Sequence, residues 1–122
     1  MEIIITNDAV LSYWGAVKPT VWISDERFAH IKAHHPGDHE YYSRFIVSAI
    51  RSPLLILADH KNERTAMFIG KTDRDGVNVV VKLARVEDAA DRSFVVTMYP
   101  IGPKRLRRLA KANPIIFGDG AI

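Results

Sequence analysis

The stretch LLILADHKNERTAMFIGKTDRDGVNVVVKLARVEDAADRSFVVTMYP, residues 54–100, decides the fold. It contains four apolar runs that are typical of β-strands: LLILA, TAMFIG, VNVVVKLARV and SFVVTMY. The segments between these runs, DHKNER, KTDRDG and EDAADR, are rich in residues that favour turns. Four consecutive strands with short connections favour an antiparallel meander. The stretch therefore predicts a four-stranded antiparallel sheet.

The residues on either side of this stretch favour helices. Ser24 is a suitable N-cap for a helix that ends at Pro36, and Asp38 is a suitable cap for a second helix up to about Arg51. A short basic helix is expected over residues 103–112. Two short apolar runs near the start, EIIIT and TVWIS, are also typical of strands. The predicted fold class is α+β, with N-terminal helices packed on a four-stranded antiparallel β-sheet and a short basic C-terminal helix.

Length and composition indicate a single domain, residues 1–122, with 48% hydrophobic and 25% charged residues. The sequence has no cysteine, which excludes disulfides, thiolate metal sites and a cysteine nucleophile, and fits a reducing compartment. The start MEIIITNDAV lacks the basic flank and long apolar run of a signal peptide, and no window is apolar enough to span a membrane. We therefore expect a soluble, cytoplasmic protein without a membrane partner.

The positive charge of the chain is concentrated in one segment. Although the net charge is only +3, the run PKRLRRLAK carries five basic residues and no acidic one. The twelve basic residues elsewhere are outnumbered by fourteen acidic residues. A basic patch of this kind is expected for a protein that binds a polyanion such as nucleic acid, and a solvated helix face would give the same pattern.

Strand alternation predicts which side chains share a face of the sheet. One face is expected to be apolar and to pack on the helices, with these residues: Val77, Val79, Val81, Leu83, Phe94, Val96 and Met98. The open face is then expected to bring together Lys82, Thr97 and Tyr99 from adjacent strands. A lysine within a run of valines is costly to bury without a role or a partner, so Lys82 is a candidate functional residue.

Four of the five histidines lie in FAHIKAHHPGDHEYY, residues 28–42. His30 and His34 are one helical turn apart, and His35 follows directly. One interpretation is a metal site that also uses His39, although the spacing fixes no acidic third ligand. A second interpretation is that the histidines interact with the C-terminal end of a helix dipole. The third is general acid–base catalysis, which suits imidazole because its pKa is about 6.5.

Catalysis has a specific target when the histidines are combined with Arg64, Lys82 and Thr97. Cleavage of RNA without a metal needs a base for the 2′-OH proton, cations for the phosphorane, and an acid for the departing 5′ oxygen. The sequence contains a candidate for each of these roles. Structural alternatives remain, because Arg64 could pair with Asp59 or Glu63 and Thr97 suits any strand.

The motifs GAVKPTVWISDERFAHIKAHHP, SPLLIL, Arg64, VVVK and VVTMYP resemble, in this order, the phage-associated nucleases of the barnase, EndoU, colicin and RelE-like superfamily. The resemblance covers about residues 15–100. It implies helices packed on one face of a four-stranded antiparallel sheet, the fold class given above. The catalytic residues that it implies are His30, His35, Arg64, Lys82 and Thr97. The expected substrate-binding residues are His34, Tyr99, Lys104, Arg105, Arg107 and Arg108.

The resulting hypothesis is a metal-independent endoribonuclease, a toxin or phage-derived effector that cleaves tRNA or another structured RNA by 2′-OH transphosphorylation in the bacterial cytoplasm. It would need no cofactor. The resemblance also implies a neutralising immunity or antitoxin protein as a partner. Two alternatives remain: a non-catalytic nucleic-acid-binding module of the same fold, and a metal-dependent hydrolase built on His30, His34 and His39.

Overall fold

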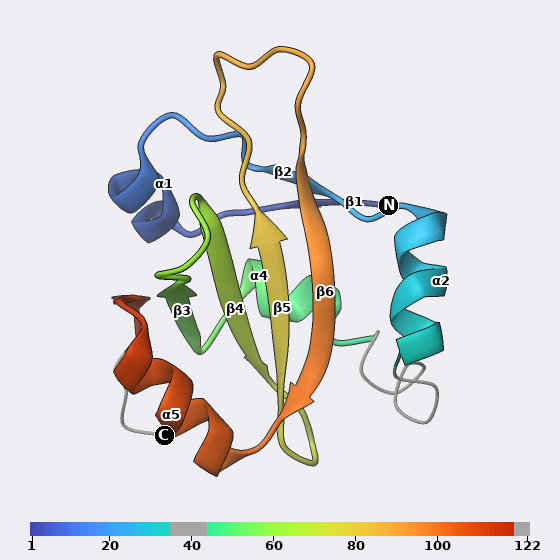
Figure 1. The fold of residues 1–122 in the computed structure, drawn as a ribbon, viewed down its shortest axis with the longest axis vertical. Helices are drawn as coiled ribbons and strands as arrows, with labels where there is room; N and C mark the ends of the chain where they lie inside the picture. Colours follow the sequence, from blue (N-terminus) through green and yellow to red (C-terminus); the bar gives the residue numbers. More distant parts are fainter. Residues whose placement is uncertain (35–43, 119–122) are drawn as a thin grey trace.

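The computed structural model of the protein describes residues 1–34 and 44–118. Its centre is one curled, mixed sheet in the strand order β1-β2-β6-β5-β4-β3-β7 (Figure 1). The strands are β1 (Glu2–Ile4), β2 (Thr20–Trp22), β3 (Leu55–Ala58), β4 (Thr65–Lys71), β5 (Gly76–Lys82), β6 (Ser93–Ile101) and β7 (Ile115–Phe117). β2 runs parallel to β6, and every other neighbouring pair is antiparallel.

The prediction of a four-stranded antiparallel sheet is wrong. The four predicted strands do form the antiparallel centre, β3 to β6, but the sheet of the described residues has seven strands and is mixed. On one side β2 adds to β6 in parallel and β1 adds to β2, and on the other side β7 adds to β3. The physical reason is that β6 and β3 would otherwise leave edge N–H and C=O groups unpaired. Short apolar segments from near both ends of the chain satisfy these groups.

Four helices lie within the described ranges: α1 (Asp8–Trp14), α2 (Asp25–His34), α4 (Ile46–Arg51) and α5 (Pro103–Ala112). The start of α2 confirms the predicted cap, because the Ser24 Oγ accepts a hydrogen bond of 3.0 Å from the Arg27 N–H. The prediction of a helix over 103–112 is also confirmed. α4 is the C-terminal part of the helix expected from Asp38, and residues 38–43 lie outside the described residues. None of these helices is both long and apolar enough to cross a membrane.

Helix α1 was not expected from the sequence, although its capping residues are visible there. The Asn7 side chain caps its N-terminus by accepting a hydrogen bond of 2.9 Å from the Ala9 N–H. Gly15 ends the helix with a φ of 77°, and its N–H bonds the Leu11 carbonyl. The polar cap and the glycine enclose only seven residues, which are too few to show a clear helical period.

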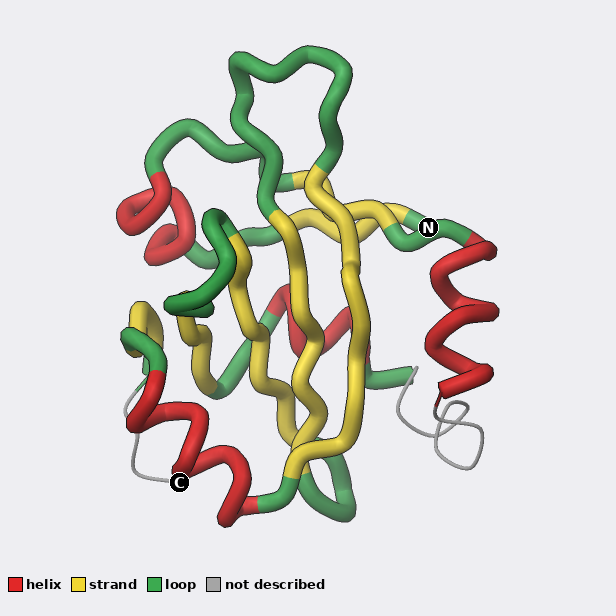
Figure 2. Tube along the Cα trace, in the orientation of Figure 1, coloured by secondary structure: helices red, strands yellow, loops and turns green. Residues whose placement is uncertain are grey.

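The helices cover both faces of the sheet (Figure 2). On one face, α4 and residues of α1 and α2 pack on the main core, which includes Phe68 and Val79. On the opposite face, Leu106 of α5 packs with Leu57 and Met67 in a second, smaller cluster. Figure 1 shows α4, drawn fainter, behind the sheet and α5 at its lower left.

A β-bulge in β6 changes which of its residues face the main core. Val80 pairs with Thr97, but the next residue, Val81, pairs with Val95, so Val96 is the extra residue. The sequence prediction for this strand is therefore wrong before the bulge: Val95 is fully buried in the main core, and Phe94 points to the other face. After the bulge, strand alternation holds as predicted.

The close contact between α4 and β4 requires a glycine at position 70 of β4. A Cβ built on Gly70 would lie 2.7 Å from the Ala49 Cβ and 3.0 Å from its Cα. We expect Gly70→Ala to lower the free energy of unfolding by about 1–3 kcal/mol, because α4 would have to move away from the sheet. Urea denaturation would measure this loss.

The control is Gly102→Ala, because a Cβ at Gly102 would meet no atom within 4 Å. Its φ of −86° also suits alanine. Equal stability of the two variants would contradict the close packing of α4 on β4.

Candidate nucleic-acid interface

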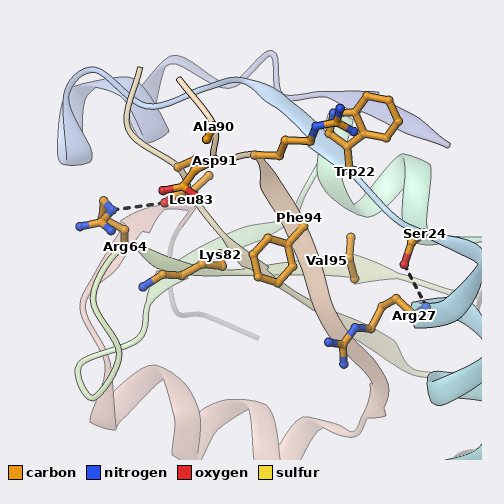
Figure 3. A pocket seen from close by; sticks show the side chains of 12 residues that line it. Trp22, Ser24, Arg27, Arg64, Lys82, Leu83, Ala90, Asp91, Phe94 and Val95 are labelled. Carbon is orange, nitrogen blue, oxygen red and sulfur yellow. Dashed lines mark hydrogen bonds between the residues drawn. The ribbon is translucent and has the colours of Figure 1, made fainter. Parts of the chain in front are cut away.

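A cleft of about 580 Å³ opens on the α5 face of the sheet, beside the junction of β2, β5 and β6 (Figure 3). We call it the basic cleft, because four of its lining residues are cations: Arg27, Arg64, Lys82 and Arg92. They come from α2, the β3–β4 turn, β5 and the β5–β6 loop. Among the described residues that line the cleft, Asp91 is the one carboxylate. The cleft therefore favours an anionic ligand.

Lys82, the predicted catalytic lysine, is the last residue of β5 and lies in the middle of the sheet. It is half-buried and pairs with Thr65 on β4 and with Phe94 on β6. Its ammonium donates a hydrogen bond to the Glu63 carbonyl. Because an ammonium has three N–H donors, Lys82 can hold this carbonyl and an anion in the cleft at the same time.

Arg64, the predicted catalytic arginine, is held from both its backbone and its side chain. Its φ of 49° is the one positive value among the described non-glycine residues, a conformation that costs free energy. The Arg64 carbonyl accepts a hydrogen bond from the Leu83 N–H. The Arg64 Nε donates a hydrogen bond of 3.3 Å to the Leu83 carbonyl. Its guanidinium also lies 3.2 Å from the Glu63 carboxylate, with 21% of the side chain exposed. The group is thus fixed at the mouth of the cleft.

The turn that carries Arg64 is organised by the Asp59 carboxylate. Burial raises the pKa of this carboxyl, but hydrogen bonds from the Asn62 side chain and from the Lys61 and Asn62 amides, together with the charge of His60, outweigh that effect. The pKa of Asp59 is therefore lowered from its ordinary value of 3.8. The bonds from the Lys61 N–H and the Asn62 side chain are both 2.9 Å long. An ionised Asp59 thus stabilises the turn at neutral pH.

Two aromatic residues give the basic cleft an apolar wall. Trp22 and Phe94 pair across β2 and β6. The Arg92 guanidinium lies over the Trp22 ring, 4.2 Å from its centroid, in a cation–π contact. Phe94 is 40% exposed, and Figure 3 shows its ring between Lys82 and Val95. The cleft therefore offers both charge and an exposed aromatic face.

The loop wall of the basic cleft is held by Lys18. Its ammonium donates hydrogen bonds to the carbonyls of Asp88 at 2.7 Å, Ala89 at 3.4 Å and Asp91. The Lys18 carbonyl in turn accepts a hydrogen bond of 2.7 Å from the Ser93 hydroxyl. The Lys18 ammonium thus holds together the loop that carries Asp91 and Arg92.

The structure brings some of the predicted catalytic residues together and not others. Arg64 and Lys82 line the same cleft. His30 is exposed on α2 and lines a neighbouring hollow of about 380 Å³, which shares Ser24 and Arg27 with the basic cleft. Thr97 is half-buried on the same face as Lys82, opposite Val80, but it does not line the cleft. Thr97 pairs with Val80, which precedes Lys82 by two residues in β5. Along the strand direction, Thr97 is therefore offset from Lys82 by about 7 Å.

Tyr99 shares the open face with Thr97 and Lys82, as the alternation predicted. Its hydroxyl accepts a hydrogen bond of 2.8 Å from the buried Asn78 amide, and the Arg105 guanidinium lies 4.5 Å from its ring centroid. Arg105 belongs to α5, whose other basic residues are also exposed: Lys104, Arg107, Arg108 and Lys111. The basic helix and the basic cleft therefore lie on the same face of the sheet.

The remaining histidines of the predicted cluster are described only in part. His34 is the last residue of α2, while His35 and His39 lie outside the described residues. Within residues 1–34 and 44–118, no three His, Cys, Asp or Glu side chains form a group that could hold a metal ion. The assignment of His35 as a catalytic residue stays a prediction.

Sequence reasoning missed two cations and both aromatic residues among those that line the basic cleft: Arg27, Arg92, Trp22 and Phe94. A signal existed for Arg27, because it precedes His30 by three residues and so faces the same side of the helix. No comparable signal existed for Trp22 and Phe94. Their meeting depends on the parallel pairing of β2 with β6 and on the bulge.

Comparison with known proteins finds no matching family model, no similar curated protein and no similar solved structure. The resemblance to the barnase, EndoU, colicin and RelE-like nucleases therefore stays a hypothesis about sequence motifs. The fold that it implied is corrected by the seven-stranded sheet. Any function must be argued from the residues of the cleft.

The role of Lys18 can be tested by removing its charge. In Lys18→Met we expect the amides of Val86, Asp88 and Asp91 to exchange hydrogen on the order of ten-fold faster, because a hydrogen bond to a charged group contributes about 1.5–3 kcal/mol. Hydrogen-exchange mass spectrometry would measure this. Lys32→Met, which removes an exposed lysine of α2, is the control. Unchanged exchange in Lys18→Met would show that the loop is held by other contacts.

Proposed function

We propose that this protein is a metal-independent endoribonuclease whose basic cleft holds the phosphate at which RNA is cut. The observation that carries the proposal is the convergence of Arg27, Arg64, Lys82 and Arg92 on one cleft with a single described carboxylate. The Glu63 carboxylate pairs with Arg64, so the positive charge that is left to attract an anion comes mainly from Arg27, Lys82 and Arg92. The proposal rests on the chemistry of this cleft and not on a fold.

The size of the positive surface favours a polymer over a small anion. The exposed basic residues of α5 lie on the same face as the cleft, at the far end of β6. Phe94 pairs with Lys82 and Tyr99 pairs with Asn78, so the span between them covers four residues of β5, or about 14 Å at about 3.4 Å per residue. A nucleic-acid strand that follows β6 would thus meet cations at both ends. Such binding weakens steeply as salt concentration rises.

The reaction that suits these residues is transphosphorylation. A base takes the proton from the 2′-OH, the 2′ oxygen forms a bond to phosphorus, and the bond from phosphorus to the 5′ oxygen breaks as an acid protonates that oxygen. The products are a 2′,3′-cyclic phosphate and a free 5′-OH. Lys82 and Arg64 would stabilise the negative charge on the phosphorane. Thr97 would donate a hydrogen bond to a phosphate further along the strand.

His30 is the proposed proton-transfer group on α2, in the hollow next to the cleft. His30 is an exposed residue whose hollow shares Ser24 and Arg27 with the basic cleft, which supports a substrate that fills both spaces. Sequence assigns the second proton transfer to His35. A nuclease that acts on tRNA or another structured RNA would damage the cell that makes it, so a neutralising partner protein is part of the proposal.

A non-catalytic nucleic-acid-binding module is the second candidate. It is favoured by one observation: His30 lines the neighbouring hollow and not the basic cleft itself. Such a module would use the same cations without turnover. The two candidates therefore differ in the fate of the bound RNA.

The proposal is tested by incubating the protein with total tRNA in EDTA and analysing the fragment ends. We expect fragments that end in a 2′,3′-cyclic phosphate. Lys82→Ala should lower the cleavage rate on the order of 10²-fold, the usual effect of removing one group that stabilises a transition state. His30→Ala should lower it by a similar factor, as expected for a general acid or base. Circular dichroism would establish that each variant is folded.

Lys71→Ala is the matched control, because Lys71 is an exposed lysine at the opposite end of the β4–β5 hairpin. It should cleave at the parental rate. RNA that is bound in low salt but stays intact would establish the binding module instead. Cleavage that EDTA abolishes would support a metal-dependent hydrolase, and RNA that is neither bound nor cut would overturn both nucleic-acid functions.

A further inference from the structure

An exposed phenylalanine lies at the centre of the basic cleft, where a polyanion alone would not need one. Phe94 is 40% exposed, and the sheet register places it between Trp22 of β2 and Lys82 of β5. These three side chains form a row across three neighbouring strands, on one face of the sheet. Adjacent strands are about 4.8 Å apart, so the aromatic ring and the ammonium are close neighbours.

The bulge at Val96 is what turns Phe94 toward the basic cleft. Without the extra residue, regular alternation from Thr97 and Tyr99 would place Phe94 in the main core and Val95 in the cleft. Bulges commonly re-aim a side chain beside a functional site. The irregular pairing costs free energy, and its structural result is an aromatic face in the cleft.

The residues around Phe94 are suited to a flat, aromatic ligand that carries negative charge. Arg92 lies over the Trp22 ring at 4.2 Å, so a planar guanidinium and an indole border the space beside Phe94. Unpaired bases stack on aromatic rings and on arginine planes in RNA-binding sites. Lys82 is placed to meet the phosphate of the same nucleotide.

We infer that Phe94, with the Arg92–Trp22 pair beside it, forms a subsite for one unpaired nucleobase, so that the cleft selects single-stranded segments of RNA. This inference rests on the proposed function, since it requires that the cleft binds RNA. It adds a substrate class: a base held in a duplex must first lose its pairing and stacking to reach Phe94, which favours single-stranded segments. The bound segment is then a loop, a bulge or a free end of a structured RNA.

The experiment measures binding of three labelled RNA probes by fluorescence anisotropy, in EDTA and at a temperature too low for turnover. The probes are a single-stranded oligonucleotide, the same strand in a duplex, and a strand of equal length and charge that contains abasic positions. We expect the protein to bind the first probe more tightly than the other two. Phe94→Ala should weaken binding of the base-bearing single strand on the order of ten-fold, the usual effect of losing one stacked base. It should leave the abasic strand unchanged.

Two variants isolate the aromatic face. Phe94→Trp should restore binding of the single strand, whereas Phe94→Leu, which keeps an apolar side chain without a ring, should not. The matched control is Phe117→Ala, because Phe117 is 39% exposed on β7, at the opposite edge of the sheet. It should bind all three probes as the parent does.

The outcomes separate this inference from the proposed function. If Lys82→Ala weakens binding of every probe while Phe94→Ala weakens none, the cleft binds RNA but has no base subsite. Binding of the duplex as tight as that of the single strand would also overturn the subsite. If the parent binds none of the probes, the proposed function fails and the subsite fails with it.

Discussion

Because Val96 has no partner residue in β5, the two parts of β6 present opposite sets of side chains to each face of the sheet. This one irregularity buries Val95 with the main core and directs Phe94 toward the same open face as Lys82, Thr97 and Tyr99. The parallel pairing of β2 with this part of β6 then sets Trp22 beside Phe94. The row of aromatic rings and an ammonium, and with it the proposed site, depends on the bulge.

The cations of the basic cleft depend on local contacts that hold each of them separately. Arg64 is fixed by the Leu83 backbone and by a turn that Asp59 stabilises. Arg92 follows a loop whose carbonyls converge on the Lys18 ammonium. Preorganised cations lose little conformational entropy when an anion binds, which is what a transition-state site requires. The contacts that hold Arg64 and Arg92 in place therefore also support the proposed chemistry.

Local signals in the sequence were enough to predict the four central strands, the two short strands β1 and β2, the cap of α2 and the bounds of α5. The rest of the fold follows from contacts between distant segments. β2 and β6 are more than seventy residues apart, and three-residue strands such as β1 and β7 carry too little pattern to reveal where they pair. For the site, the sequence alone indicated two residues. Lys82 stands in a run of valines, and Arg64 stands in a turn. Phe94 was assigned to the core because a bulge leaves no mark in simple alternation.

The central claim is that RNA occupies the basic cleft, and it is tested most directly by titrating the isotope-labelled protein with a short single-stranded RNA and following its backbone amides by NMR. The account predicts that the largest shift changes fall on Trp22, Lys82 and the segment from Arg92 to Phe94, with smaller changes along α5. Changes confined to α5, with the cleft residues unaffected, would contradict it, because the RNA would then bind a basic helix alone.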